Sequence, residues 1–434
     1  MERWTGLLGL LALFAVAWSI STARRRFPWR LVAASVAVQL ALAWILLRVP
    51  PAVAALDAVA RGVTAVISAA GAGAGFVFGD LADMGQSWGF IFAVQAGSVI
   101  IMFGALMSVG YHLGIVQRLV ALLAWCLRRT LGITGVDALA VAANVFVGQT
   151  EAPLVVRPYL AGMTRAQLML LMTGGFATIA GSVLGVYVLM LGGEDEAVRL
   201  EFTKHLLIAS VLSAPAAIAM AGVIVPETAA PPDDRDVRAA PVADTRNLLD
   251  AAAAGTTDGL KLAVNVAAML IAFLALLALV NMPLSALSDW EPVAAWREAR
   301  GFGPLSVEGG LGWLFTPLAA LMGVPWREAP LLGSLLGQKI FLTELIAYGS
   351  LGDLLAAPAD EAGRPAVSAR TATIAAYALC GFANIPSIGI QIGGVAALVP
   401  ARRGELAELG LRAMLAGAFA CWCTACVASL VLPG

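Results

Sequence analysis

Eight segments of this chain are apolar over lengths that suffice to cross a lipid bilayer, and this feature restricts its fold most. A transmembrane helix needs about 20 mainly apolar residues. The chain is 60% hydrophobic and 13% charged, whereas a soluble protein is about 25% charged. Lipid must therefore be the solvent for much of its surface. The predicted spans are Trp4–Ser21, Leu31–Leu47, Gly89–Leu113, Ala166–Leu191, Leu206–Val225, Leu260–Val280, Thr371–Val399 and Leu411–Leu432.

Arginines indicate how these spans are oriented. Arg24–Arg26 and Arg30 follow the first span, and Arg402 and Arg403 precede the last. Such residues are enriched in cytoplasmic loops. The first apolar run is followed by its positive charge and not preceded by it, so we interpret it as a retained membrane helix and not as a signal peptide. Both termini are then periplasmic, and we predict a multi-pass protein of the bacterial inner membrane.

Other segments between the spans are apolar but interrupted. Ala52–Asp83 is rich in Gly and Ala and contains charges, and we expect it to lie along the membrane interface. Val116–Thr130 is predicted to be a short peripheral helix. Ala138–Leu160 and Leu331–Ala356 are polar in the middle and are predicted to be re-entrant hairpins, since irregular backbone at membrane depth must be buried in protein or line a watery cavity. Pro226–Asp258 is the one long polar linker.

The two halves around this linker repeat the same pair of motifs. The first half contains Gly148-Gln149-Thr150-Glu151 and then Gly175-Phe176-Ala177-Thr178-Ile179. The second contains Gly337-Gln338 with Glu344, and then Gly381-Phe382-Ala383-Asn384-Ile385. Many secondary transporters are built from such repeats and bind substrate at the midplane, where helices are broken. We therefore predict a helix break at each Gly-Phe-Ala-polar-Ile segment.

Two carboxylates stand inside these apolar hairpins. Burying a charge at the centre of a bilayer costs about 2.5–3.5 kcal/mol or more, so Glu151 and Glu344 are predicted to be functional. The alternative is that each is a structural ion-pair member, with Arg157 and Lys339 as nearby partners.

Several other classes of site are not indicated. The net charge of −1 gives no basic surface for nucleic acid. The five cysteines all stand in apolar stretches and are interpreted as packed thiols. His112 and His205 are far apart in sequence and do not predict a metal or nucleophile site. Tyr187, near the end of a predicted span, is interpreted as an interfacial anchor.

The hairpin and break motifs resemble those of one transporter family. The run 148–160 of the first hairpin, the run 337–344 of the second, and Tyr377–Asn384 with Ser387 in the broken helix are similar to concentrative nucleoside transporters. The resemblance begins near Gly89 and extends to the C-terminus. It implies a sodium/nucleoside symporter, a homotrimer and an all-α membrane fold. That fold has eight transmembrane helices, two re-entrant helical hairpins, interfacial helices, an inverted repeat, and separate scaffold and transport domains.

The resemblance also implies how the chain is divided. Residues 1–88 are the variable N-terminal helices and interfacial helix, and 89–130 a scaffold helix with a peripheral helix. Residues 131–225 are the first repeat, 226–258 a cytoplasmic linker, and 259–325 a scaffold helix with interfacial helices. Residues 326–434 are the second repeat with the last helix.

The site residues are carried over from the same resemblance. The residues implied to contact the nucleobase are Gln149, Thr150 and Glu151, with Val183 beside it. The residues implied to bind the ribose hydroxyls are Glu344, Asn384 and Ser387, with Phe382 beside them. The implied sodium ligands are the side chains of Asn144 and Thr178 and the carbonyls of Val147, Thr178 and Ile179. Thr178 stands where the family commonly has Ser and Thr343 where it commonly has Asn.

These residue types suit that chemistry. A carboxylate accepts strong hydrogen bonds from ribose hydroxyls, and Gln and Thr both donate to and accept from base edges. Sodium is a hard cation that should prefer oxygen ligands, as other hard cations do. The alternatives are a proton-coupled nucleoside symporter, through Glu151 or Glu344, and a transporter or channel for another small polar solute. An intramembrane enzyme lacks a nucleophile–base pair in this sequence, and a mere scaffold leaves the buried carboxylates unexplained.

Overall fold

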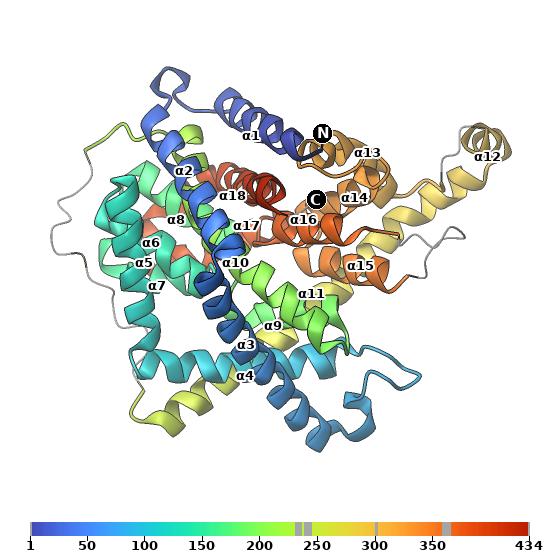
Figure 1. Cartoon of the computed structure of the whole chain (residues 1–434), viewed down its shortest axis with the longest axis horizontal. Coiled ribbons are helices and arrows are strands. Elements are labelled where there is room, and N and C mark those ends of the chain that lie inside the picture. The colour runs from blue at the N-terminus through green and yellow to red at the C-terminus, as the bar shows by residue number, and fades with distance from the viewer. Residues whose placement is uncertain (1, 231–236, 238–244, 300–302, 358–365, 433–434) are drawn as a thin grey trace.

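The fold was analysed in a computed structural model that describes every residue except 1, 231–236, 238–244, 300–302, 358–365 and 433–434. Every regular element among the described residues is a helix (Figure 1). The α-helices of the first half are α1 (Glu2–Ser19), α2 (Trp29–Arg48), α3 (Pro50–Phe78), α4 (Phe92–His112), α5 (Ile115–Leu131), α6 (Gly135–Phe146), α7 (Ala152–Val155), α8 (Arg165–Ala177), α9 (Gly181–Gly192) and α10 (Glu196–Ile224). Those of the second half are α11 (Leu248–Asp289), α12 (Glu291–Glu298), α13 (Val307–Leu321), α14 (Ala329–Phe341), α15 (Glu344–Ala356), α16 (Ala369–Leu379), α17 (Ile385–Leu398) and α18 (Arg403–Val431).

All eight predicted spans are helical, with changed ends. Within the described residues, seven helices are long and apolar enough to cross a membrane. Six of them overlap predicted spans, and the seventh, Pro50–Ala82, overlaps the segment expected at the interface. That segment forms one continuous helix, α3, followed by a short 3-10 turn, so its length also permits a crossing. The helix α11 begins at Leu248, inside the predicted linker, because Asn247 caps it by accepting from the backbone N–H of Asp250.

Both hairpins and both helix breaks occur at the predicted motifs. In the first hairpin, α6 ends at Phe146 and the chain turns through Gly148–Glu151 into the short α7. In the second, α14 and α15 are joined by Leu342 and Thr343. Thr343 caps α15 through its side chain, a role that Asn fills equally well. The predicted span from Ala166 is broken into α8 and α9, and the span from Thr371 into α16 and α17.

The last helix, α18, packs against both broken helices and lies in the middle of the bundle (Figure 1). Small residues allow this approach. A Cβ on Gly417 would lie 3.0 Å from the carbonyl carbon of Phe176 in α8, and one on Gly410 would lie 2.8 Å from a methyl group of Ile388 in α17. Cys421 and Cys423 on the same helix are buried, as expected for packed thiols.

A second close crossing joins α4 to α11, the helix that runs across the molecule towards α12 in Figure 1. Gly255 and Gly259 form a Gly-x-x-x-Gly pair on α11, and Gly104 faces them from α4. A Cβ on Gly104 would lie 2.7 Å from the carbonyl oxygen of Gly255, and one on Gly259 would lie 2.8 Å from the Cα of Ile101. Small residues at such spacing let membrane helices approach closely.

We expect Gly259→Val to weaken this crossing, because its side chain would overlap the backbone of α4. Overpacking of this kind costs about 1–3 kcal/mol. The thermal unfolding midpoint of the detergent-purified protein should fall. Gly310→Val is the matched control, since nothing lies within 4 Å of a Cβ at that position of α13. Equal midpoints for the two variants would contradict this account of the crossing.

Candidate functional site

The two helix breaks contact each other. Gly381 has a φ of +100°, a backbone conformation that favours glycine. A Cβ at this position would lie 2.6 Å from the carbonyl oxygen of Phe176 and 2.8 Å from the carbonyl carbon of Ala177. Phe176 and Ala177 end α8 just before the first break, so the two Gly-Phe-Ala segments cross backbone against backbone.

A carboxylate from the second hairpin contacts the second break. Glu344 is buried at the start of α15, with 3% of its surface exposed. Its Oε1 accepts a hydrogen bond from the Tyr187 hydroxyl at 2.9 Å, and its Oε2 accepts one from Nδ2 of Asn384 at 2.8 Å. Asn384 in turn caps α17, because its Oδ1 accepts from the backbone N–H of Ser387 at 2.8 Å. Three of the predicted site residues, Glu344, Asn384 and Ser387, are therefore brought together, and Phe382 lies half-buried in the same loop.

The tip of the first hairpin reaches the same helix two turns further along. A Cβ on Gly394 of α17 would lie 3.5 Å from Cγ2 of Thr150. Gly394 follows Ser387 by seven residues, which places both on one face of α17 about 10 Å apart. The Glu344 cluster and the hairpin tip thus border one stretch of the same helix face.

The tip itself is partly open. Gln149 is buried, whereas the side chains of Thr150 and Glu151 are exposed. The carboxylate of Glu151 lies within electrostatic range of Tyr111 on α4 and Asp258 on α11. The hairpin tip therefore faces the helices of the glycine crossing.

Val183 stands in the first turn of α9 and is buried. The residue before that helix, Ala180, approaches the hairpin, because a Cβ on Gly148 would lie 3.2 Å from its Cβ. The first turn of α9 is thus adjacent to the first hairpin.

A group of neutral oxygens lies between the first hairpin and the first break. The Thr178 hydroxyl donates to the carbonyl oxygens of Asn144 at 2.6 Å and Gly174 at 2.9 Å. The amide nitrogen of Asn144 donates to the carbonyl oxygens of Ala140 at 3.0 Å and Leu171 at 3.3 Å. The side-chain oxygen of Asn144 is buried and has no hydrogen-bond partner among the described residues. Burying an oxygen without a hydrogen-bond partner costs free energy. A cation or another donor from outside the protein would offset this cost.

The predicted carbonyl ligands are free to face such a cation. Val147 and Thr178 have extended backbones, with φ of −119° and −118°. Ile179 follows in the same break. No hydrogen bond to the carbonyl oxygens of Val147, Thr178 or Ile179 occurs in the part of the chain that the structure describes. The candidate ligands are all neutral oxygen atoms, which fits a hard cation such as sodium.

The proposed structural ion pairs do not form among the described residues. Lys339 donates instead to the carbonyl oxygens of Ala378 and Cys380, at 2.9 and 3.0 Å. No ion pair between Arg157 and Glu151 occurs in the same part of the chain, and Arg157 is exposed.

Two residues of the site were missed in the sequence. The interpretation of Tyr187 as an interfacial anchor is wrong: it is fully buried, stacks on Tyr348 with ring centroids 4.5 Å apart and donates to Glu344. Gln391 is buried on α17 and donates to the carbonyl oxygen of Met172 at 3.0 Å, at the first break. The signal for Gln391 was an amide inside an apolar helix, whereas nothing local distinguished Tyr187.

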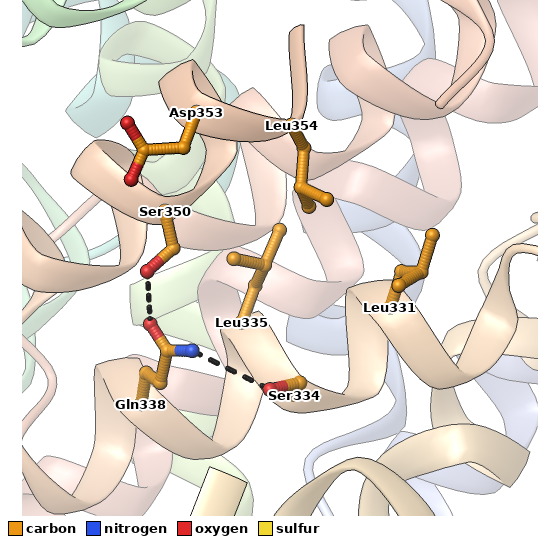
Figure 2. A pocket seen from close by; sticks show the side chains of 7 residues that line it. All are labelled: Leu331, Ser334, Leu335, Gln338, Ser350, Asp353 and Leu354. Atoms are coloured by element: carbon orange, nitrogen blue, oxygen red, sulfur yellow. Dashed lines mark hydrogen bonds between the residues drawn. The ribbon is translucent and has the colours of Figure 1, made fainter. Parts of the chain in front are cut away.

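The glutamines of the two hairpin motifs have different surroundings. Figure 2 shows that Gln338 lies between the arms of the second hairpin, where it accepts from Ser350 at 2.8 Å and donates to Ser334 at 3.4 Å. These residues line a cavity of about 300 Å3 between α14 and α15 that also includes Asp353. Gln149, in contrast, contacts the first break, because a Cβ on Gly175 would lie 2.8 Å from its Cβ. The cavity lies towards the base of the hairpin and not at its Glu344 end.

Comparison with known families matches almost the whole chain. Residues 205–429 match the family described as Na+ dependent nucleoside transporter C-terminus, and 8–81 match its N-terminus. Residues 93–194 match a family described as nucleoside recognition.

Relatives and solved structures agree with these matches. An uncharacterized transporter of Haemophilus influenzae is 39% identical over 100% of this chain and 98% of its own length. Sodium/nucleoside cotransporter 1 of Rattus norvegicus is 37% identical over 99% of this chain and 64% of its own length. CNTnw in an inward-facing substrate-bound state is 36% identical, covers 99% of this chain and 98% of its own, and superposes with a TM-score of 0.88. From its family matches and from these relatives, the chain belongs to the Na+-dependent, or concentrative, nucleoside transporters.

Proposed function

We propose that this protein imports nucleosides by sodium symport across the bacterial inner membrane. The observation that carries the proposal is the shared face of α17. Glu344, Asn384 and Ser387 border one end of it, and Thr150 borders the other, about two helical turns or 10 Å away. That separation suits a small molecule with hydroxyls at one end and a flat base at the other.

The polar groups at each end suit the two parts of a nucleoside. Glu344 and Asn384 supply acceptors and a donor for ribose hydroxyls, with Ser387 and Phe382 beside them. Gln149, Thr150 and Glu151 supply both donors and acceptors for the edges of the base, and Val183 contributes an apolar surface. Specificity follows because a solute without the hydroxyls would leave buried polar groups unpaired.

Sodium would be held by Asn144, Thr178 and the carbonyls of Val147 and Ile179. Bound there, the ion supplies positive charge to the unpartnered oxygen of Asn144 and to carbonyls freed by the break. Asn144 and Gln149 both lie against Gly175, so ordering of the first by sodium would order the second. Linkage then requires nucleoside and sodium to raise each other's affinity by the same factor.

We further propose an elevator-type alternating-access mechanism. A transport domain built from the two hairpins and the two broken helices would move past a scaffold that includes α4 and α11. Solved structures of the relative CNTnw in inward-facing and outward-facing states support alternating access. Movement as one body is favoured here by the contact between the breaks, which ties the two halves of the site together.

The protein is also proposed to be a homotrimer in lipid, and a carrier without enzymatic activity. Much of α11 beyond its crossing with α4 is exposed and apolar, including Ile271 and Met282. This surface needs lipid or a second copy of the chain as its neighbour. The relatives are named as transporters, which supports a carrier role.

Glu344→Gln should reduce sodium-driven uptake of uridine and adenosine into proteoliposomes by about 10- to 100-fold, because a charge-assisted hydrogen bond contributes about 1.5–3 kcal/mol. Glu151→Gln should have a similar effect, and both variants should assemble as the wild type does. Asp353→Asn, on the same helix as Glu344, is the matched control and should transport normally. Near-normal uptake by either glutamine variant would remove that carboxylate from the site.

Replacing sodium by choline should weaken nucleoside binding to the purified protein, measured by calorimetry, because the oxygens of the first break then lack their cation. Asn144→Ala should lose this difference, while Asn281→Ala on α11 should keep it. Equal affinities in sodium and choline would exclude the linkage. Uptake that follows a proton gradient instead would favour proton coupling, and uptake of labelled sugars or amino acids would indicate another solute.

A further inference from the structure

Lys339 places a charged group in the interior of the second half. Its side chain is 0% exposed, and it stands on α14 two residues before that helix ends. The ammonium nitrogen donates to the carbonyl oxygens of Ala378 at 2.9 Å and Cys380 at 3.0 Å. Removing an ammonium group from water costs several kcal/mol. The position therefore requires a compensating interaction of comparable size.

The two carbonyls lie at the C-terminal end of α16, directly before the second break. The free carbonyls of a helix C-terminus carry a partial negative charge that favours a cation. The carboxylate of Glu344 is five residues further along the chain and interacts electrostatically with Lys339. Helix end and carboxylate together provide the negative charge that Lys339 neutralises.

The repeat places the same two carbonyls in the first half. When Gly381 is aligned with Gly175, Ala378 corresponds to Met172 and Cys380 to Gly174. The carbonyl oxygen of Met172 accepts from Gln391, and that of Gly174 accepts from the Thr178 hydroxyl. Both donors to the carbonyls of the first half are neutral, whereas one ammonium group donates to both carbonyls in the second.

Among the described residues, no Lys or Arg side chain donates to these two carbonyls of the first half. Its hairpin contributes Asn144, whose buried side-chain oxygen has no hydrogen-bond partner. Its carboxylate, Glu151, is exposed at the hairpin tip and not enclosed like Glu344. The two halves thus share a backbone arrangement, but only in the second does a positively charged side chain, Lys339, bond to the carbonyls before the break.

We propose that Lys339 is a tethered cation, the built-in counterpart in the second half of the ion that the first half takes from solution. It is a positioning residue: by fixing Cys380 it fixes the start of the loop whose last residue, Asn384, donates to Glu344. Only one exchangeable sodium ion per protomer is then needed. This inference rests on the proposed nucleoside site.

A purely structural role would depend on the volume of Lys339 and not on its charge. Lys339→Met keeps the length of the side chain and removes the charge. Lys339→Ala removes both and leaves room for a small soluble cation. Lys261→Met is the matched control, because Lys261 is exposed on α11 and, among the described residues, forms an ion pair only with Asp258.

The test is calorimetric binding of uridine and adenosine to the purified protein at saturating sodium, with and without ethylammonium. We expect Lys339→Met and Lys339→Ala to bind at least tenfold more weakly than the wild type. Ethylammonium should restore binding at least threefold in Lys339→Ala and not in Lys339→Met, where the methionine fills the space. Lys261→Met should match the wild type throughout.

Affinity within twofold of the wild type for Lys339→Met would overturn the proposal, as would a lack of rescue in Lys339→Ala. If neither variant purifies as a monodisperse protein, the number of sodium ions that the wild type binds per nucleoside is measured instead. One sodium ion supports the tethered cation, and two overturn it. A wild type that binds neither nucleoside would instead refute the proposed function, so the two failures are distinguishable.

Discussion

The contact between the two helix breaks is the constraint on which the rest of the structure depends. Each break frees backbone groups that a continuous helix would pair, and at membrane depth those groups must find partners in protein or in a watery cavity. Gly381 allows the two backbones to touch because it has no Cβ to separate them from Phe176. The last helix, α18, closes over the crossing with Gly417. The residues proposed to bind ligand are therefore gathered where the backbone is least regular.

Partners for the backbone carbonyls near the breaks come from different parts of the chain. Thr178 donates to the carbonyl oxygen of Gly174 in its own half. Gln391 of the second half donates to Met172 of the first, and Lys339 of the second hairpin donates to Ala378 at the end of α16. These long-range bonds make the two halves interdependent. The two halves differ in charge. In the second half the ammonium group of Lys339 donates to the carbonyls before the break, whereas in the first half the side-chain oxygen of Asn144 has no partner among the described residues. A site that gains and loses a soluble ion needs that difference.

The sequence predicted the hairpins and both breaks, because the repeat marks them with motifs of fixed order, whereas the grouping of Glu344 with Asn384 came from the family resemblance. It was wrong about Tyr187, since an aromatic residue near a helix end is compatible with both an interfacial and a buried position. It also placed the end of the linker too late, because the alanines after Leu248 have high helix propensity but no hydrophobic periodicity to mark the helix start. The length of α3 likewise permits either a position along the membrane interface or a crossing of the membrane.

The sequence by itself determined that the chain is helical and membrane-embedded, because its apolar runs have the length of a bilayer and its composition leaves no other solvent. It also determined where the helices break, because Gly-Phe-Ala segments with a polar residue occur only there in each half. Only the tertiary structure decided which groups meet. Lys339 and Glu344 are close in sequence and carry opposite charges, yet the ammonium group bonds to helix-end carbonyls and the carboxylate to Tyr187 and Asn384. That choice depends on how the two broken helices cross, and the crossing is set by packing between segments about 200 residues apart, which no local pattern encodes.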